Sequence, residues 1–530
     1  MKKINTTNQK NQEAKYIFVT GGVISGVGKG IMAASIGTIL KAKGLKVSMQ
    51  KCDPYFSVDA GLLDPREHGE CYVTRDGAET DLDLGHYERF LDEEMTGNST
   101  WTSGKLYKRL IEAERAGKFG GRTVQLVPHV TGIIQETFLE NAKNFESDVH
   151  IVEIGGTVGD MEGQHFIEAI REFAVKVGRE NCLFVHVCYI PWLLTSNEFK
   201  TKPAQNSIRD LREFGIIPDM VVARMDTHKI AGAGEIARKL AIFSGVRNDS
   251  VVLMPDAKSV YEVPVNAVHG GVLPPLERFI DHGDPDMREW ETLAGKIGEK
   301  YAKKIKVGLA VTGEDNSETH LSVLEALKAA AWANEVGLEI RWLKSEELTE
   351  EDLEGLDGIL APGGFGSLGA EGKIKIAQRA LERDIPYLGI GMGMQVAVIA
   401  AARIAGEKRA NSEEFSAKVP TELVCRLRRD GKIKLGDSKI RISKNTKTRE
   451  IYGEEEVVER CRHRYEVNPE FVNVMEKGGL VVTGRTDQGE IEFMEAPGKK
   501  FYQLAMGHLE FKSRPLRAHP VFREFVKKMK

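Results

Sequence analysis

A glycine-rich turn that carries a lysine, near the start of the chain, is the feature that most constrains the fold. The turn reads GGVISGVGKG over residues 21–30. It follows YIFVT at residues 16–20, a run typical of a buried strand, and precedes a helical pattern at residues 31–40. Glycines let backbone N–H groups approach phosphates, the helix N-terminus favours anions, and Lys29 adds a positive charge. The sequence therefore predicts a triphosphate-binding loop in an α/β sheet.

Two departures from the standard phosphate loop affect the expected metal site. The spacing from Gly22 to the Gly28–Lys29 pair is one residue longer than in that loop. Gly30 also stands where a Ser or Thr hydroxyl normally binds Mg²⁺, so we expect carboxylates elsewhere to hold the metal. The alternative interpretation is a glycine-rich turn that only packs a helix against a sheet.

The composition is that of a globular protein with more than one domain. The chain has 530 residues, which is too long for a single core, with 41% hydrophobic and 29% charged residues. The net charge of -4 gives no reason to expect nucleic acid or an anionic membrane as partner. No apolar run approaches a membrane span, and the polar start lacks the apolar region of a signal peptide. The six cysteines are scattered, which predicts a reducing, cytoplasmic location and neither a disulfide framework nor a zinc site.

Strand-like runs alternate with helical patterns twice along the chain, which predicts two doubly wound α/β domains. The runs of the first series lie at residues 46–51, 149–153, 182–188, 220–224 and 251–254, with helices such as 166–177 and 207–214 between them. The runs of the second series lie at residues 305–311, 338–342, 358–361 and 386–390. We expect a disordered tail at 1–14, a first domain at 15–281, a linker at 282–304 and a second domain at 305–530.

Charged residues follow several of the first-series strands, at the sheet edge where α/β proteins bind ligands. Lys51 ends the second strand, and Glu153 begins a glycine-rich segment that also contains Asp160 and Glu162. Asp83 and Glu153 are the candidate Mg²⁺ ligands, because Mg²⁺ prefers oxygen ligands. For a single acid the alternative is a solvated surface role. The segment KTKPAQ at residues 200–205 is either a second phosphate site or a solvated basic turn.

Longer strings in both halves resemble the CTP synthase family. In the first half these are GGVISGVGKG, KCDPY, HGE, DGAETDLDLGHYERF, VEIGGTVGDME, KTKPAQ and SVYEVP. In the second half they are PGGFGSLGAEGK, ANSEEF, CRHRYEVN and GHLEFKSRP. The resemblance runs from about Tyr16 to the last helix, and DGAETDLDLGHYERF is its most specific string. It implies an N-terminal amidoligase domain with a P-loop-type parallel sheet and a C-terminal class I glutaminase-like domain.

The resemblance implies a reaction and a set of site residues in the first domain. ATP phosphorylates the 4-oxygen of UTP, and ammonia then displaces phosphate to give CTP, with Mg²⁺ as metal cofactor. Lys29 and Lys51 are the expected catalytic cations. The expected ATP contacts are Gly26, Val27, Gly28, Lys29, Gly30, Ile31 and Asp83. The expected UTP or CTP contacts are Ser25, Asp160, Met161, Glu162, Lys200, Thr201, Lys202, Pro203, Ala204, Gln205 and Lys239. Ala204 and Asn206 replace the family's usual Thr and His, which weakens the expectation of base-side hydrogen bonds.

The second half differs from the family at the position of its catalytic cysteine. The family's turn is usually GICLGMQ, and this chain reads GIGMGMQ, with Gly391 at the position of the nucleophile. Glycine cannot form the covalent glutamyl intermediate, although it tolerates a strained turn. The expected base and orienting residue, His508 and Glu510, remain, while Leu368 and Leu509 replace the usual Arg and Pro. The expected glutamine contacts are Gly364, Met392, Gly393, Met394, Gln395, Glu414 and Arg464.

Three interpretations stay open at this point. The first is a working CTP synthase that takes free or externally supplied ammonia. The second is a non-catalytic paralogue that binds nucleotides and regulates an active synthase. The third is an active enzyme in which Gly391 reflects an introduced or erroneous codon. The resemblance further implies a homotetramer, feedback inhibition by CTP, and GTP and glutamine as further ligands to be tested.

Overall fold

The computed structural model describes residues 14–226, 233–415 and 423–530, and the expected N-terminal tail lies almost wholly outside this range. The chain divides into two compact units, and neither is one continuous stretch. The first unit comprises residues 1–58 and 98–294, and the second comprises residues 59–97 and 295–530. The sequence alone suggested one continuous first domain over 15–281, so the assignment of residues 59–97 to the second unit differs from that expectation.

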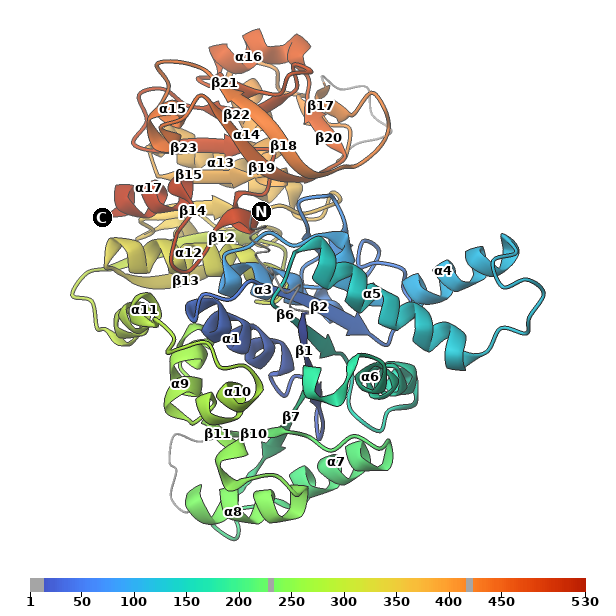
Figure 1. The fold of residues 1–530 in the computed structure, drawn as a ribbon. Coiled ribbons are helices and arrows are strands. Elements are labelled where there is room, and N and C mark those ends of the chain that lie inside the picture. The colour runs from blue at the N-terminus through green and yellow to red at the C-terminus, as the bar shows by residue number, and fades with distance from the viewer. Residues whose placement is uncertain (1–13, 227–232, 416–422) are drawn as a thin grey trace, which may run out of the picture. The chain divides into compact units, whose positions relative to one another are not determined.

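The first unit contains a seven-stranded parallel sheet (Figure 1). In spatial order its strands are β11 (Val251–Pro255), β10 (Met220–Met225), β7 (Cys182–Ile190), β1 (Lys15–Gly21), β6 (Val149–Ile154), β2 (Val47–Asp53) and β5 (Thr100–Thr102). A separate hairpin is formed by β8 (Trp192–Leu193) and β9 (Glu198–Phe199). The central strands are buried along their length, as continuous apolar runs predict for a sheet covered on both faces.

Helices cover both faces of this sheet. The helices of the first unit are α1 (Lys29–Ala42), α4 (Ser103–Arg115), α5 (Thr131–Asn144), α6 (Gln164–Val177), α7 (Lys202–Glu213), α8 (Ala233–Ser244), α9 (Val263–His269) and α10 (Leu273–Phe279). On one face Phe18 of β1 packs against Phe138 of α5 and Phe173 of α6. Helices α1 and α9 pack together on the other face (Figure 1).

The second unit contains a nine-stranded mixed sheet. In spatial order its strands are β13 (Gly337–Lys344), β12 (Lys304–Val311), β14 (Gly358–Ala361), β15 (Tyr387–Ile390), β23 (Tyr502–Ala505), β22 (Ile491–Glu495), β21 (Val481–Arg485), β18 (Lys434–Ile442) and β19 (Glu456–His463). The pairs from β13 to β23 are parallel, and those from β23 to β19 are antiparallel. A smaller sheet consists of β16 (Asn411–Ser412), β17 (Leu423–Leu427) and β20 (Tyr465–Val467).

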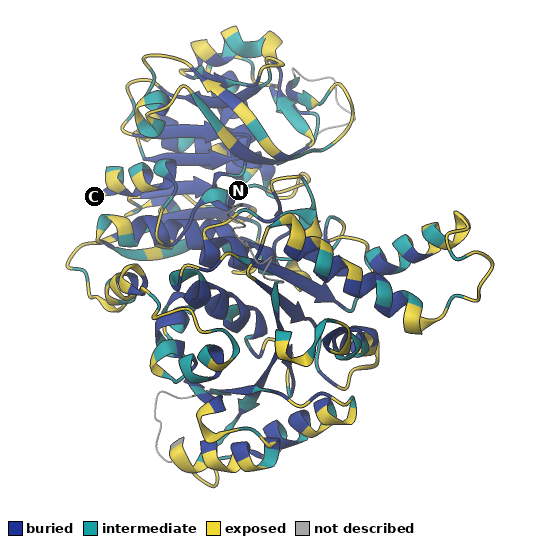
Figure 2. Ribbon diagram, in the orientation of Figure 1, coloured by how far each residue is buried: buried dark blue, intermediate teal, exposed yellow. Residues whose placement is uncertain are grey.

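Two hydrophobic cores lie on the two faces of the parallel part of this sheet. Helices α12 (Leu321–Asn334) and α17 (Pro520–Met529) contribute to one core, and α13 (Ala370–Arg383) and α14 (Met392–Ile404) contribute to the other. The shorter helices α15 (Lys447–Tyr452) and α16 (Val472–Lys477) complete the C-terminal part of the second unit. Figure 2 shows the strands buried and the outer faces of the helices exposed. This confirms the α/β fold class in both halves.

Residues 59–97 form a small substructure of the second unit. It contains α2 (Pro65–His68), the hairpin of β3 (Tyr72–Val73) and β4 (Glu79–Thr80), and α3 (Asp83–Leu91). The carboxylate of Glu88 is buried and accepts hydrogen bonds from Tyr72 Oη at 2.7 Å and Arg514 Nη2 at 2.7 Å. Buried ion pairs therefore connect this segment to the C-terminal part of its own unit.

The expected strands agree with the structure to within one or two residues at most ends. The expected linker at 282–304 contains α11 (Arg288–Gly298), and β12 starts at its last residue. Among the described residues, no helix combines the length and the apolar character that crossing a membrane requires.

Candidate functional site

The glycine-rich loop expected to bind phosphate joins a strand to a helix in the first unit, as the sequence predicts. Strand β1 ends at Gly21 and α1 begins at Lys29, with Gly26 at φ 69° and Gly28 at φ 99° between them. Only glycine adopts this left-handed backbone at low cost. A Cβ at Gly22 would lie 1.6 Å from Ser207 Oγ, so a side chain cannot fit there either. The conformation of the loop therefore requires glycine at these positions. The loop leads directly into the N-terminus of α1.

Lys29 is buried at the first turn of α1. Its Nζ donates a hydrogen bond to the backbone oxygen of Gly156 at 2.8 Å, in the loop that follows β6. Burial lowers the pKa of Lys29, and the carboxylate of Glu153 is the strongest of the influences that oppose this shift. A buried ammonium group held beside a glycine loop can neutralise phosphate charge.

Three more charged residues of the first unit act electrostatically on Lys29. Lys51 adds to the lowering of its pKa, whereas Asp53 and Asp160 oppose it. Lys51 Nζ lies 3.5 Å from Asp53 Oδ1, and residue 51 is the register partner of Glu153 across β2 and β6. With Lys29 and Glu153, these residues place three carboxylates and two ammonium groups at the carboxyl ends of neighbouring strands, which is the ligand-binding edge of such sheets.

A cavity of about 330 Å³ at the end of β11 was not expected from the sequence. Residues that line it include Asp256, Lys258 and Glu262. Arg224, at the end of β10, pairs with Asp256 at 3.2 Å and donates through Nη1 to the backbone oxygen of Gly26 at 3.1 Å. Arg224 therefore connects the wall of this cavity to the phosphate-binding loop. A charged residue near the end of an otherwise apolar strand was the available sequence signal.

The segment expected to contact the triphosphate of UTP is partly buried. Lys202 is exposed, whereas Lys200 is half-buried and pairs with Glu198. The side chain of Ala204 is fully buried in an apolar cluster with Cys188 and Ile208, so only its backbone could face a ligand. Of the remaining expected residues, Thr201 and Gln205 are buried, and Pro203 is half-buried. The exposed ones are Ser25, Asp160, Met161, Glu162 and Lys239.

The two expected Mg²⁺ ligands belong to different units. Glu153 is buried near the end of β6 in the first unit, and Asp83 starts α3 in the second. Their sharing of one metal ion therefore stays a prediction. Other acids of the Asp83 segment have partners in their own unit, for example Glu79, which accepts a hydrogen bond from Arg462 Nε at 2.9 Å.

In the second unit, Gly391 forms a sharp turn between β15 and α14. Its φ is 54° and its ψ is -110°, and its N–H donates to the backbone oxygen of Ala505 at 2.8 Å. A Cβ built on Gly391 would lie 3.7 Å from His508 Nε2 and 3.5 Å from Gly363 Cα. The position therefore faces the histidine and has room for a side chain, although its backbone conformation is strained for any residue other than glycine.

His508 and Glu510 are arranged as a base and its orienting carboxylate. His508 Nδ1 and Glu510 Oε1 are 2.7 Å apart, and Glu510 is 4% exposed. The ring of His508 stacks on Phe511 with centroids 5.0 Å apart. The residue between the pair, Leu509, is buried in the core formed with α12 and α17. This geometry matches a hydrolase base that faces a residue without a side chain.

Expected glutamine-contact residues surround a small cavity of about 20 Å³ beside Gly391. Gln395 Nε2 donates to Glu414 Oε2 at 2.9 Å, and the N–H of Gly366 donates to Glu414 Oε1 at 3.0 Å. Burial raises the pKa of Glu414, and these hydrogen bonds oppose the shift. Gly364, Met392 and Arg464 line the same cavity, whereas Gly393 and Met394 are buried in α14.

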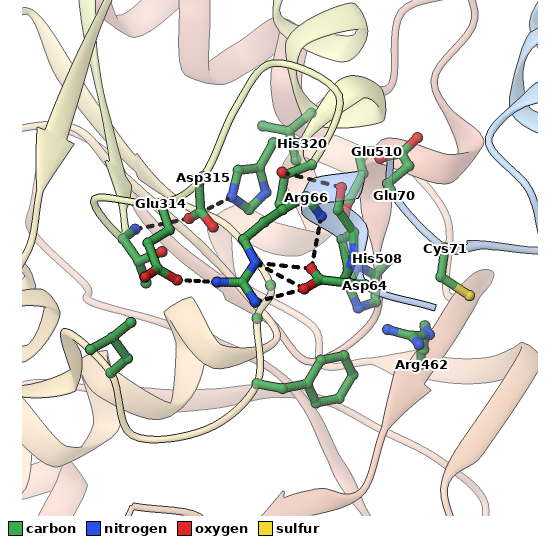
Figure 3. Close-up of a pocket in the computed structure, with 18 of the residues that line it drawn as sticks. Asp64, Arg66, Glu70, Cys71, Glu314, Asp315, His320, Arg462, His508 and Glu510 are labelled. Carbon is green, nitrogen blue, oxygen red and sulfur yellow. Dashed lines mark hydrogen bonds and ion pairs between the residues drawn. The ribbon is translucent and has the colours of Figure 1, made fainter. Parts of the chain in front are cut away.

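A larger cavity of about 350 Å³ adjoins the first and shares with it Gly363, Gly364, Phe365, Arg462 and His508. Figure 3 shows charged side chains of its wall, among them Arg66 paired with Asp64 and Glu314. Leu368 also lines it and is 53% exposed.

Burial raises the pKa of Glu70, in the wall of this cavity, to about 7. Glu70 accepts hydrogen bonds from the N–H and the hydroxyl of Ser322. Its carboxyl group therefore changes protonation near neutral pH.

All six cysteines are free thiols and are buried. Cys71 lines the larger cavity, and burial raises its pKa to about 12. Cys461 lies close to His463 and Glu492, a grouping that the sequence analysis did not expect. Lys434 Nζ lies 2.5 Å from Glu492 Oε1 and already supplies a positive charge there. Neither thiol is therefore a ready nucleophile, because the thiolate is the reactive form.

The chain is similar to known proteins over nearly its whole length. Residues 15–278 match the family model described as CTP synthase N-terminus, and residues 317–528 match that of glutamine amidotransferase class-I. A CTP synthase of Carboxydothermus hydrogenoformans is 45% identical over 530 residues, which cover 97% of this chain and 98% of the relative. A CTP synthase of Pyrococcus abyssi is 43% identical over 533 residues, with the same shares covered. A solved glutaminase domain of Trypanosoma brucei CTPS with bound acivicin is 33% identical, with a TM-score of 0.41, and covers 43% of this chain and 94% of its own. This chain belongs to the CTP synthase family.

Proposed function

We propose that this protein catalyses the ATP-dependent amination of UTP to CTP and takes its ammonia from outside its own chain. Membership of the CTP synthase family supports the reaction. The observation that carries the ammonia dependence is the contrast between two turns. The phosphate loop keeps its buried lysine, Lys29, whereas the turn that faces His508 has only Gly391.

In the proposed first step, the 4-oxygen of UTP attacks the γ-phosphorus of ATP, and ADP leaves. Backbone N–H groups over residues 26–31 bind the phosphates of ATP, and Lys29 and Lys51 stabilise the negative charge that moves between the phosphates and the uracil oxygen. In the second step, ammonia attacks C4 of the ring and phosphate leaves, which gives CTP. Electrostatic stabilisation and positioning carry most of the catalysis in phosphoryl transfer. The burial of Lys29 beside the Gly156 carbonyl supports its role, because low exposure strengthens its charge interactions.

We propose Glu153 and Asp83 as the residues that hold Mg²⁺. Oxygen ligands suit this ion, and Gly30 offers no hydroxyl. The carboxylate of Glu153 is 3% exposed and lies in a group of charges with a surplus of acids, which fits a bound cation. Bound Mg²⁺ supplies charge neutralisation to the phosphates.

We propose that the cavity at the end of β11 receives the nucleoside part of ATP. Its connection to the phosphate loop through Arg224 supports this assignment, because nucleoside and phosphates must be contiguous. Ser25, Lys200, Lys202 and Lys239 remain the proposed contacts to the triphosphate of UTP, with Asp160, Met161 and Glu162 at an overlapping CTP site. A homotetramer and regulation by CTP and GTP are proposed on the resemblance alone.

The proposed loss of glutaminase activity rests on the absence of a nucleophile. His508 could activate a thiol at position 391, but glycine offers none. Burial raises the pKa values of the thiols of Cys71, Cys425 and Cys461, so none of them substitutes for the missing group.

The test is CTP formation from UTP, ATP and Mg²⁺ with saturating ammonium and no glutamine. The proposal predicts CTP, ADP and phosphate in equal amounts. Absence of CTP under these conditions would favour the alternative of a non-catalytic nucleotide-binding paralogue, which should still bind ATP and UTP.

A further inference from the structure

Three side chains that can bind a metal ion lie close together inside the second unit. They are Cys461 and His463, on β19, and Glu492, on β22. The thiol sulfur, a ring nitrogen and a carboxylate oxygen of these residues all lie within 4.8 Å of one another. The three residues are buried, with exposed fractions of 0%, 6% and 0% respectively. The proposed synthesis of CTP uses none of them.

The backbone explains why these side chains meet. Successive side chains of a strand point to opposite faces, so Cys461 and His463, two residues apart, share one face of β19. Strands β21 and β18 separate β22 from β19 in the order of the sheet, but the segment after β23 contacts both. A Cβ on Gly507 would lie 3.9 Å from Cys461 Sγ. The N–H of Met506 donates to the backbone oxygen of Glu492 at 2.9 Å.

His463 and Glu492 carry buried polar atoms without a hydrogen-bond partner among the residues that the structure describes. These atoms are both ring nitrogens of His463 and Oε2 of Glu492. His463 Nε2 lies 3.8 Å from Glu492 Oε1, which is too long for a hydrogen bond. Buried polar atoms are rarely left unsatisfied, because their removal from water is then uncompensated. A cation that accepts a lone pair from each residue would satisfy both.

The surroundings of the cluster suit metal binding by His463. Burial, and then the positive charge of Lys434, lower the pKa of His463 well below its usual value, so the ring is neutral and offers a lone pair. Burial raises the pKa of the Cys461 thiol, so the thiol keeps its proton in the absence of a metal ion. Metal binding would therefore break the S–H bond, form a metal–sulfur bond and release one proton to solvent.

Lys434 is the alternative partner for the charge of Glu492. Its Nζ lies 2.5 Å from Glu492 Oε1 and 2.7 Å from Glu490 Oε2. This pairing uses one oxygen of Glu492 and leaves Oε2 for a metal ion. Glu490 still neutralises Lys434 when Glu492 binds the metal, and the thiolate of Cys461 and the carboxylate of Glu492 offset the two charges of a divalent ion. Lys434 is therefore compatible with a metal ion at this place.

The donor atoms select zinc among the common divalent ions. Zn²⁺ accepts thiolate, imidazole and carboxylate ligands, whereas Mg²⁺ prefers oxygen. Zinc bonds of about 2.0–2.3 Å place the ligand atoms of a tetrahedral site roughly 3.3–3.8 Å apart, so the present spacing of up to 4.8 Å needs to close by about 1 Å. The spacing of the cysteines did not predict a zinc site, because the ligands lie on two strands and only one is a cysteine.

We propose that Cys461, His463 and Glu492 bind one Zn²⁺ ion per chain, with a fourth position open to water. The bound ion would join β19 to β22. The inference goes beyond the synthesis of CTP and does not depend on it.

Titration of the chelator-treated full chain with Co²⁺ tests the proposal, because Co²⁺ replaces Zn²⁺ in such sites and absorbs light by charge transfer when a thiolate binds it. The thiolate-to-Co²⁺ band should saturate at one ion per chain. Addition of Zn²⁺ should remove the band, and addition of Mg²⁺ should not. Absence of the band, saturation at another ratio, or displacement by Mg²⁺ would each overturn the proposal.

Cys461→Ser removes the thiolate and changes one atom of the side chain. This variant should lose the charge-transfer band and bind Zn²⁺ at least ~10-fold more weakly, since even a residue that only supports a metal ligand is commonly worth ~10–100-fold in affinity. Cys425→Ser, at a buried thiol of the same unit outside the cluster, is the matched control and should change neither. A band that persists in the Cys461→Ser variant would show that the assignment is wrong. If this variant does not fold, anomalous diffraction from a crystal of the unaltered protein soaked in Zn²⁺ decides: the ion should lie between β19 and β22, and an ion found only elsewhere would overturn the proposal.

Discussion

The phosphate loop of the first unit and the Gly391 turn of the second are built alike. Each follows a buried parallel strand, β1 or β15, and each leads into a long helix through a glycine with positive φ, Gly28 at 99° or Gly391 at 54°. In each case the backbone exposes N–H groups at the start of the helix. The two turns differ in the side chains that face the ligand space.

At the first turn, the side chain that carries the proposed chemistry is present and supported. Lys29 is held by the Gly156 carbonyl, and three carboxylates and the ammonium group of Lys51 act electrostatically on it. At the second turn the supporting pair His508 and Glu510 is intact, but nothing at position 391 can react. The two turns therefore share a backbone arrangement and supporting groups, and they differ in whether a side chain is present at the turn.

Removal of the Lys29 side chain should leave the first turn, like the second, without the group that carries its proposed chemistry. Of the changes considered, this one should have the largest effect on CTP formation. Lys29→Ala should lower ammonium-dependent CTP formation by ~10²–10³, because one catalytic donor of charge is commonly worth that much. The measurement is the initial rate of CTP formation at saturating ATP, UTP and ammonium. Lys41→Ala, near the C-terminal end of the same helix, is the control and should change the rate less than twofold. A Lys29→Ala variant of normal rate would show that the loop's lysine has no catalytic role.

The two units also differ in how buried charges near these turns are compensated. In the first unit carboxylates act on the buried Lys29, whereas in the second unit burial raises the pKa of Glu70 in the wall of the larger cavity. Burial raises the pKa of Glu70 to about 7, whereas an unfolded chain ionises this group at an ordinary acid pKa. Between these two pKa values the folded state binds more protons at Glu70 than the unfolded state does. The contribution of Glu70 to the free energy of unfolding therefore falls as the pH rises from the ordinary acid pKa through about 7. Glu70→Gln should stabilise the protein at pH 8 by at most roughly 3 kcal/mol and have little effect at pH 5.

Thermal or urea unfolding at the two pH values measures this effect. The exposed Glu67, on α2, gives the control Glu67→Gln, which should not alter the pH dependence. If the Glu70→Gln variant were less stable than the unaltered protein at pH 8, the carboxyl would be paired as an anion and the account of its burial would be wrong.

Restoring a side chain at position 391 should cost stability and can restore chemistry. Gly391→Ala should destabilise the second unit by ~1–3 kcal/mol, because of backbone strain and without a steric clash. Gly391→Cys should have a similar cost and place a thiol next to His508. Glutaminase activity should appear in the Cys variant and stay absent in the Ala variant. Its absence from a folded Cys variant would show that the site has decayed further, with Leu368 and Leu509 as the residues to revert.

The strands and the phosphate loop could be predicted because continuous apolar runs and a glycine pattern are local signals. The position of the Gly391 turn next to His508 was also predictable, through the resemblance of both segments to one family. The assignment of residues 59–97 to the second unit was not, because it depends on buried pairs such as Glu88 with Arg514, which are far apart in the sequence.

The most direct test of the central claim is a comparison of glutamine with ammonium as the nitrogen source for CTP. Both assays use the unaltered protein with ATP, UTP, Mg²⁺ and GTP, and glutamate release is measured in the same reaction. We expect CTP formation with ammonium, and background CTP and background glutamate with glutamine. Release of glutamate at a rate that matches CTP synthesis would contradict it, because a residue other than position 391 would then have to supply the nucleophile.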